Sequence, residues 1–113
     1  MSTYHRAPSS AAININAQTG TSYTTVLRDA GHVVTMNNAS ANTFTIPPNT
    51  DVAYTIGDVI SIGQIGAGQT TITAGAGVTL NAEVGLLLNA QYAFGSALKI
   101  ATDTWLVSGS LSA

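Results

Sequence analysis

Short strand-forming runs separated by turn residues constrain the fold of this sequence more than any other feature. Beyond residue 21 the chain alternates between segments rich in Val, Ile, Thr, Tyr and Phe and clusters of Gly, Asn, Asp or Pro. The β-branched and aromatic residues favour a pleated backbone, and the turn residues end each run after a few positions. Nine strands are predicted in this way, at 23–28, 32–37, 43–46, 59–65, 70–74, 78–81, 86–92, 98–101 and 104–108.

The turn residues agree with a β-rich fold. Glycines at 29–31, 66–68 and 75–77 supply the positive φ angles that tight connections need. The Gly-Ala-Gly at 75–77 predicts a hairpin between the runs on either side of it. Two Gly-Ala-Gly motifs do not indicate a solenoid, because a solenoid needs three or more repeats to bury a continuous core.

Proline and glycine also limit the secondary structure between these turns. Pro47 and Pro48 lack backbone donors, so the run before them is expected to end at Ile46. A helix over 86–101 is disfavoured by Gly95 within it. We therefore expect an all-β fold with no helix.

The predicted domain organisation is one folded unit preceded by an arm. A chain of 113 residues fits a single domain. Residues 1–20 are polar, small and irregular and predict an extended N-terminal arm, in which the alternation of Ile13 and Ile15 is the one indication of a strand. Residues 21–113 are predicted to form a compact antiparallel sandwich or a jelly-roll-like barrel.

Charged residues are unusually scarce in this chain. It contains 3 Lys or Arg and 5 Asp or Glu, or 7 % of its residues, against about 25 % in an average domain. Because 45 % of the residues are hydrophobic, this is not the composition of a disordered chain. Uncharged polar side chains cost less to bury against a partner than Lys or Glu. We therefore expect a surface covered by other protein subunits, as in a tight homo-oligomer.

The same composition excludes several kinds of partner and chemistry. Three basic residues and a net charge of −2 are too few to neutralise the phosphates of a typical duplex-binding surface, so nucleic acid is not an expected partner. No apolar run approaches the roughly 20 residues of a membrane-spanning helix, so no membrane association is expected. Cysteine is absent, which excludes a disulfide, a thiolate metal site and a cysteine nucleophile.

No residues form a catalytic or metal-binding pattern. His32 follows a turn glycine and would need a serine or a carboxylate held against it to act in catalysis. Asp51 and Asp58 lack the alternating oxygen ligands of a calcium loop and are interpreted as turn or strand-end residues. The glycines at 66–68 lack the rest of a phosphate-binding motif. We predict no enzymatic activity, no cofactor and no metal site.

The candidate contact residues are one aromatic side chain and several residues of the arm. Trp105 is the single tryptophan, and it is predicted to lie either in the core or at a subunit interface, where aromatic residues are enriched. The arm residues expected to contact a partner are Tyr4, His5, Arg6, Ile13 and Ile15.

Three stretches of the sequence carry a resemblance to a known family. They are DAGHVVTMNNASANTFTIPPN at 29–49, GDVISIGQIGAGQTTITAGAGVTLN at 57–81 and ATDTWLVSGSL at 101–111. Together they resemble a small β module that recurs in virion proteins of tailed bacteriophages, and the resemblance covers about residues 20–113. It implies a β-rich and often trimeric structural unit that has no catalytic residues.

The resemblance implies a place in the virus particle. Tail fibres usually carry a long N-terminal shaft, whereas about 20 residues precede the module in this sequence. We therefore expect a capsid decoration (cement) protein on the capsid surface, which forms a homotrimer and stabilises the lattice of the major capsid protein or binds another virion protein. The alternative is a tail-fibre or receptor-binding component that attaches to host surface glycans. A hydrolase of surface polysaccharide ranks third, because no paired carboxylates are evident.

Overall fold

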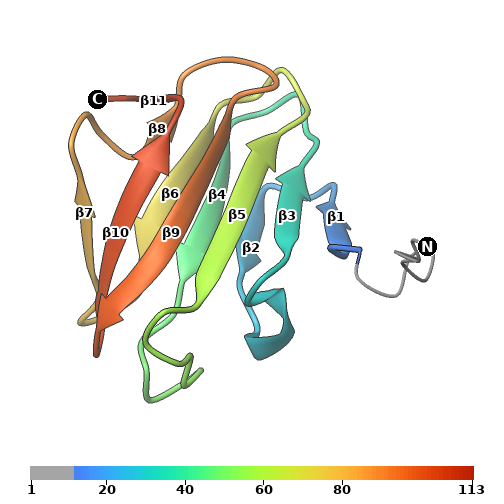
Figure 1. Ribbon diagram of the computed structural model, residues 1–113. Helices are drawn as coiled ribbons and strands as arrows, with labels where there is room; N and C mark the ends of the chain where they lie inside the picture. The colour runs from blue at the N-terminus through green and yellow to red at the C-terminus, as the bar shows by residue number, and fades with distance from the viewer. Residues whose placement is uncertain (1–11) are drawn as a thin grey trace, which may run out of the picture.

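The computed structural model describes residues 12–113, and in this part of the chain eleven strands form two sheets. The six-stranded sheet has the spatial order β1 (Ile15–Gln18), β3 (Val33–Met36), β5 (Val59–Gln64), β9 (Phe94–Ala101), β10 (Thr104–Gly109), β7 (Thr79–Ala82). The five-stranded sheet has the order β11 (Leu111–Ser112), β8 (Leu87–Leu88), β6 (Thr70–Ala74), β4 (Asn42–Ile46), β2 (Ser22–Thr24). Figure 1 shows the six-stranded sheet in front, with β7 and β1 at its two edges.

The chain crosses repeatedly from one sheet to the other, and this makes neighbouring strands parallel. In the six-stranded sheet β1, β3 and β5 are adjacent and parallel, and in the other sheet β2, β4 and β6 are adjacent and parallel. Parallel neighbours need a crossover connection, which is supplied here by the strand in the opposite sheet. The pairs β1–β2, β3–β4 and β5–β6 therefore stack as three successive rungs. The antiparallel pairs β5–β9, β9–β10, β6–β8 and β8–β11 and the parallel pair β10–β7 complete both sheets.

The all-β prediction is confirmed, but the predicted antiparallel arrangement is wrong. Both sheets are mixed, and parallel pairs outnumber antiparallel ones by five to four. The predicted hairpin at 75–77 does not form, because this segment joins β6 in one sheet to β7 in the other. Alternation of apolar and polar residues specifies which face of a strand is buried, and it does not specify the direction of the neighbouring strand.

Most predicted strands lie where they are expected, and the differences have local causes. The predicted strand at 23–28 ends early because a 3₁₀ turn forms at Leu27–Asp29. The predicted strand at 86–92 is reduced to β8, and Tyr92 in the following turn has a φ of 70°. β4 ends at Ile46, directly before the two prolines, as predicted. No α-helix occurs in residues 12–113.

β1 lies inside the segment that the sequence assigns to an arm. It pairs with β3 in the register Ile15 opposite Val33, so the sheet begins before residue 20. Residues 1–11 of the predicted arm lie outside the described part of the chain.

One hydrophobic core lies between the sheets. Alternate residues of β3, β4, β5 and β10 point into it, in keeping with the period of two along a strand. Trp105 is only 1 % exposed, and its ring meets Tyr54 edge to face with the centroids 5.4 Å apart. Of the two interpretations of Trp105, this burial matches the core position. The fully buried apolar side chains include Val34, Met36, Phe44, Ile46, Ile60, Ile62 and Leu88.

The loops that connect the two sheets, here called corners, are hydrogen-bonded to one another, as neighbouring strands are. The Gly68 amide donates to the Asn38 carbonyl oxygen over 2.9 Å, and the Asn38 side chain donates to the Thr19 carbonyl oxygen over 2.8 Å. A Cβ atom on Gly68 would run into the backbone of Ser40. The glycines at 66–68 are therefore explained by close packing of two rungs rather than by a phosphate-binding loop.

Candidate functional site

Charged side chains in residues 12–113 lie outside the strands, with one exception. Arg28 and Asp29 belong to the 3₁₀ turn, and the strand residue Lys99 points into the interior and is 2 % exposed. The outward-facing positions of both sheets consequently carry no charged side chain. The remaining charged residues lie in loops and turns and are Asp51, Asp58, Glu83 and Asp103.

Apolar side chains gather on the outer face of the six-stranded sheet. In the register of β5, β9 and β10, Val59 lies opposite Leu98 and Leu98 lies opposite Leu106. Neighbouring strands lie about 4.8 Å apart, so these side chains are in reach of one another. Phe94 and Ile100 extend the row along β9, and Leu106, Phe94 and Ile100 are 49 %, 48 % and 45 % exposed. We call these five side chains the apolar face.

A row of serine hydroxyls separates the two ends of the apolar face. Ser61 lies opposite Ser96, which lies opposite Ser108, and the hydroxyl oxygens of Ser61 and Ser96 are 3.0 Å apart. This pair is hydrogen-bonded within the sheet. Beyond Ser61, the same row of side chains continues with Val33 on β3 and Ile15 on the edge strand β1.

The outer face of the five-stranded sheet is hydroxylated instead. Its central strands present two parallel rows of side chains in register, and none of them is charged. We call this surface the hydroxyl face, and its rows are Ser22, Thr43 and Thr71, and Thr24, Thr45 and Thr73.

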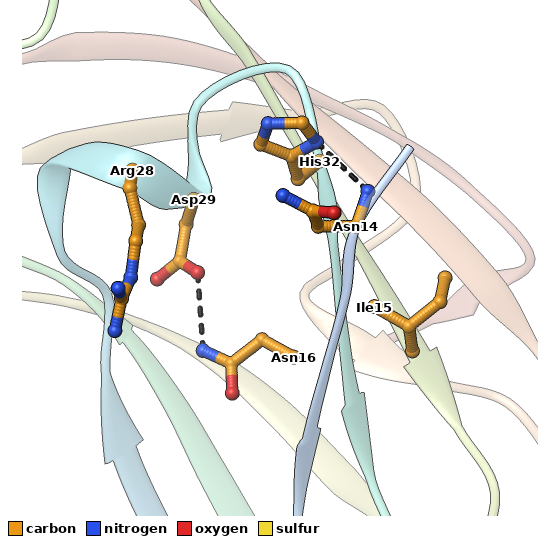
Figure 2. Close-up of a pocket in the computed structure, with 6 residues that line it drawn as sticks. All are labelled: Asn14, Ile15, Asn16, Arg28, Asp29 and His32. Atoms are coloured by element: carbon orange, nitrogen blue, oxygen red, sulfur yellow. Dashed lines mark hydrogen bonds between the residues drawn. The ribbon is translucent and has the colours of Figure 1, made fainter. Parts of the chain in front are cut away.

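A polar cleft of about 260 Å³ lies beside β1 and the 3₁₀ turn. Figure 2 shows the side chains that line it, with Asn16 bonded to Asp29 and the Asn14 backbone bonded to His32. Arg28 and Ile15 complete its lining.

Asp29 is the most strongly bonded group of this cleft. Its carboxylate is 2 % exposed and accepts hydrogen bonds from Asn16 Nδ2 (3.1 Å), the Tyr23 hydroxyl (2.7 Å) and the Val26 amide (2.9 Å). A buried carboxylate is tolerated only when it is bonded in this way. Asp29 therefore ties β1 and β2 to the turn that leads into β3.

Besides burial, the Asp29 carboxylate is a cause of the raised pKa of Tyr23. Burial, the hydrogen bond to Asp29 and the charge of Asp29 raise the pKa of Tyr23 to about 12, and the Asn16 amide lowers the pKa in part. Burial likewise raises the pKa of Tyr54 to about 12, against the opposing effect of its hydrogen bond with Thr25. Both phenols stay protonated and act as structural donors at neutral pH.

His32 lines the cleft without a catalytic alignment. Its Nδ1 accepts a hydrogen bond from the Asn14 amide over 3.0 Å. Within residues 12–113 the bonds of the Asp29 carboxylate go to Asn16, Tyr23 and Val26, and His32 is not among them. The pair therefore does not form the orienting contact of a general base. In the same residues no group of three or more His, Asp or Glu is placed to hold a metal ion.

Lys99 is a buried cation that the sequence analysis missed. Its Nζ donates to Asn49 Oδ1 over 2.7 Å and to the Tyr54 carbonyl oxygen over 2.8 Å. These bonds attach the 47–58 loop to β9. The available signal was the alternation along the strand, which places Lys99 on the same side of β9 as the buried Ala97.

The predicted contact residues fall in different places. Tyr4, His5 and Arg6 lie outside the described residues. Ile13 and Ile15 are 57 % and 60 % exposed, and Ile15 belongs to the edge strand β1.

One of the two predicted turn carboxylates has a structural contact. Asp58 Oδ2 accepts the Thr55 amide over 2.8 Å, which closes a turn before β5. Asp51 is exposed in the 47–58 loop. The sequence analysis also missed Asp29 and the apolar face, because both depend on which strands become neighbours.

Comparison with known proteins finds no relative: no protein-family model, no curated protein and no solved structure matches this chain. Among the helical segments of residues 12–113, none is long and apolar enough to cross a membrane.

Proposed function

We propose that this protein is a non-enzymatic structural component of a tailed-bacteriophage virion, and specifically a capsid decoration protein that forms a homotrimer and stabilises the coat lattice. One observation carries the proposal: both sheets present outward faces without a charged side chain. Interfaces are depleted of charge at their centre because desolvating an unpaired charge is costly. Such faces suit permanent contact with other protein.

The polar groups of the cleft support a non-enzymatic role. The Asp29 carboxylate is occupied by three donors, and His32 Nδ1 is occupied by a backbone amide. These bonds hold β1 and β2 in place, which is a structural use of the two side chains that most resemble catalytic groups.

Stabilisation of the coat follows from mass action. A protein that binds the assembled lattice but not dissociated subunits stabilises the lattice by RT ln(1 + [L]/Kd), or about 2.7 kcal/mol at 100 times Kd. The proposed partner is the major capsid protein or another virion protein.

The location and copy number of the protein on particles test this proposal. We expect cryo-electron microscopy and quantitative mass spectrometry to find it spread over the capsid in hundreds of copies, as about one trimer per local lattice axis would require. Particles stripped of the protein should lose heat resistance and regain it when the protein is added back. Stripped particles that remain equally heat-resistant would contradict the stabilising role.

The contribution of the arm can be separated from that of the sheets. Deleting residues 2–11 leaves every described strand intact, whereas deleting 2–16 would also remove Asn16 and its bond to Asp29. If the arm grips the coat, the 2–11 deletion should stay folded and oligomeric but no longer attach to particles. Retained attachment would place the contact on the β domain.

A receptor-binding tail component is the second candidate, and the polar cleft favours it. Among the side chains that line it, Asn14 and Arg28 offer amide and guanidinium groups of the kind that bind sugar hydroxyls. A few copies at the tail tip, binding of the purified protein to host cells and loss of this binding in Arg28→Ala would support it. Absence of cell binding together with a capsid location would reject it.

For the fold, we propose a two-sheet sandwich of stacked rungs rather than a jelly roll. Jelly rolls are built from antiparallel Greek keys. The parallel neighbours β1, β3 and β5, and β2, β4 and β6, support stacking of successive rungs instead.

A further inference from the structure

We propose that the apolar face, formed by Val59, Phe94, Leu98, Ile100 and Leu106, is the surface through which copies of this chain associate. The inference rests on the self-association in the proposed function and names the contact. It commits to a second copy of this chain as the occupant.

The first argument is exposure of large apolar side chains at the centre of a sheet. Leu106 and Phe94 are about half exposed on β10 and β9, which are interior strands of the six-stranded sheet. Single exposed apolar residues are common, but the apolar row of Val59, Leu98 and Leu106 in register across three strands marks an interaction surface.

The second argument is the state of the polar groups within the face. The Ser61 and Ser96 hydroxyls are bonded to each other, so covering this part of the row leaves neither of them without a partner. Gly63 on β5 leaves room beside Phe94, whose ring lies 3.4 Å from the position of a Cβ atom there. The part of the face around Ser61 and Ser96 can therefore be desolvated at little cost.

The third argument is charge. The outward positions of this sheet carry no charged residue, and the whole chain has a net charge of only −2. Copies that associate through this surface bring no like charges together, and repulsion between whole copies is weak. Because this face carries no charge, it cannot select a charged partner by electrostatic complementarity.

The fourth argument is area. Six strands about 4.8 Å apart and four to eight residues long, or about five on average, span roughly 29 Å by 17 Å, a projected area of about 500 Å². Side-chain relief adds to this, and a stable interface needs about 600 Å² per partner. The five side chains of the apolar face cover only part of this area, so the contact has to extend over most of the outer surface of the sheet, including Val33 and Ile15 at the end of the serine row.

The experiment places a charge on each face in turn. Leu106→Glu changes the apolar face, and Thr45→Glu changes an outward position of the hydroxyl face as the matched control. Sedimentation velocity at micromolar concentration should show an oligomer for the wild type and Thr45→Glu. Leu106→Glu should associate at least about 30-fold more weakly, because its carboxylate would be buried without a partner. Circular dichroism verifies that each variant is folded.

A cross-link provides a second measurement if Leu106→Glu fails to fold. The chain contains no cysteine, so a single introduced thiol reports only contacts between copies. A short bis-maleimide should join subunits of Ser108→Cys on the apolar side and not those of Thr24→Cys on the hydroxyl face. Equal or reversed cross-linking would overturn the proposed interface.

The outcomes separate this inference from the proposed function. An oligomer that survives Leu106→Glu and cross-links through Thr24→Cys would reject the apolar face and leave self-association standing. A wild-type protein that stays monomeric would reject the inference, while the capsid location would still be decided by the copy number on particles. Fibres of unlimited length would instead indicate pairing through β1 and β7, the edge strands among the described residues, and would also reject it.

Discussion

Replacing Asp29 by asparagine tests whether this buried carboxylate holds the first rung onto the rest of the fold. The substitution keeps the size of the side chain and exchanges one acceptor oxygen for an NH2 donor. The native oxygens accept bonds from Asn16 Nδ2 (3.1 Å), the Tyr23 hydroxyl (2.7 Å) and the Val26 amide (2.9 Å). In either orientation of the new amide, at least one of these donors faces another donor.

The magnitude follows from this lost partner. A buried polar group left without its bond costs about 1–3 kcal/mol. With an unfolding entropy of about 2.1 cal/mol/K per residue, a chain of this size loses about 4 °C in Tm for each kcal/mol. We therefore expect Tm to fall by about 4–12 °C in Asp29→Asn.

Two assays read the effect in different ways. Thermal unfolding gives the loss of stability, and Asp51→Asn is the matched control because Asp51 is exposed in a loop. Tyrosinate absorbance during an alkaline titration follows the pKa of Tyr23, which should fall from about 12 towards its ordinary value of 10 without the bond and charge of Asp29. Burial remains, so the pKa should stay above that value. Tyr23→Phe assigns the titration.

Two results would refute this reasoning. One is an Asp29→Asn protein that melts within about 1 °C of the Asp51→Asn control. The other is a Tyr23 pKa that does not change. Either result would mean that the three bonds to Asp29 do not hold β1 and β2 in solution.

Three further perturbations test other parts of the structure. Trp105→Ala should cost about 3–5 kcal/mol in denaturant unfolding, because it empties the largest side-chain volume in the core; a cost below 1 kcal/mol would contradict its burial. The pKa of both Tyr23 and Tyr54 is raised, so their contribution to stability should be complete below pH 10 and be lost between about pH 10 and 12, as the unfolded chain ionises first; stability that stays level across this window would disprove it. Gly68→Ala should lower Tm because its Cβ would meet the backbone of the neighbouring corner, whereas Gly20→Ala, with open space around it, should be neutral or slightly stabilising; equal melting temperatures would argue against close stacking of the corners.

Local features of the sequence predicted much of the local structure. β4 ends before Pro47 as expected, and Gly31 and Gly77 have the positive φ angles, 78° and 79°, that their turns suggested. These features depend on steric and hydrogen-bonding preferences within a few residues.

The candidate site was less predictable than the strands. In the cleft, Asn16 of β1 contacts Asp29 of the 3₁₀ turn, and no spacing in the sequence predicts that contact. The burial of Lys99 against the 47–58 loop was not predicted either. Both contacts join segments whose meeting depends on the path of the whole chain.

The sequence by itself determined the β-rich class, the positions of most strands and the scarcity of charge. The tertiary structure alone decided that the chain crosses between two sheets, that β1, β3 and β5 run parallel, and that Val59, Leu98 and Leu106 meet on one face. The physical reason is the difference in range between the interactions that determine these two sets of features. Side-chain alternation is a property of one strand, whereas the identity and direction of its neighbours depend on how all the connections close around one shared core.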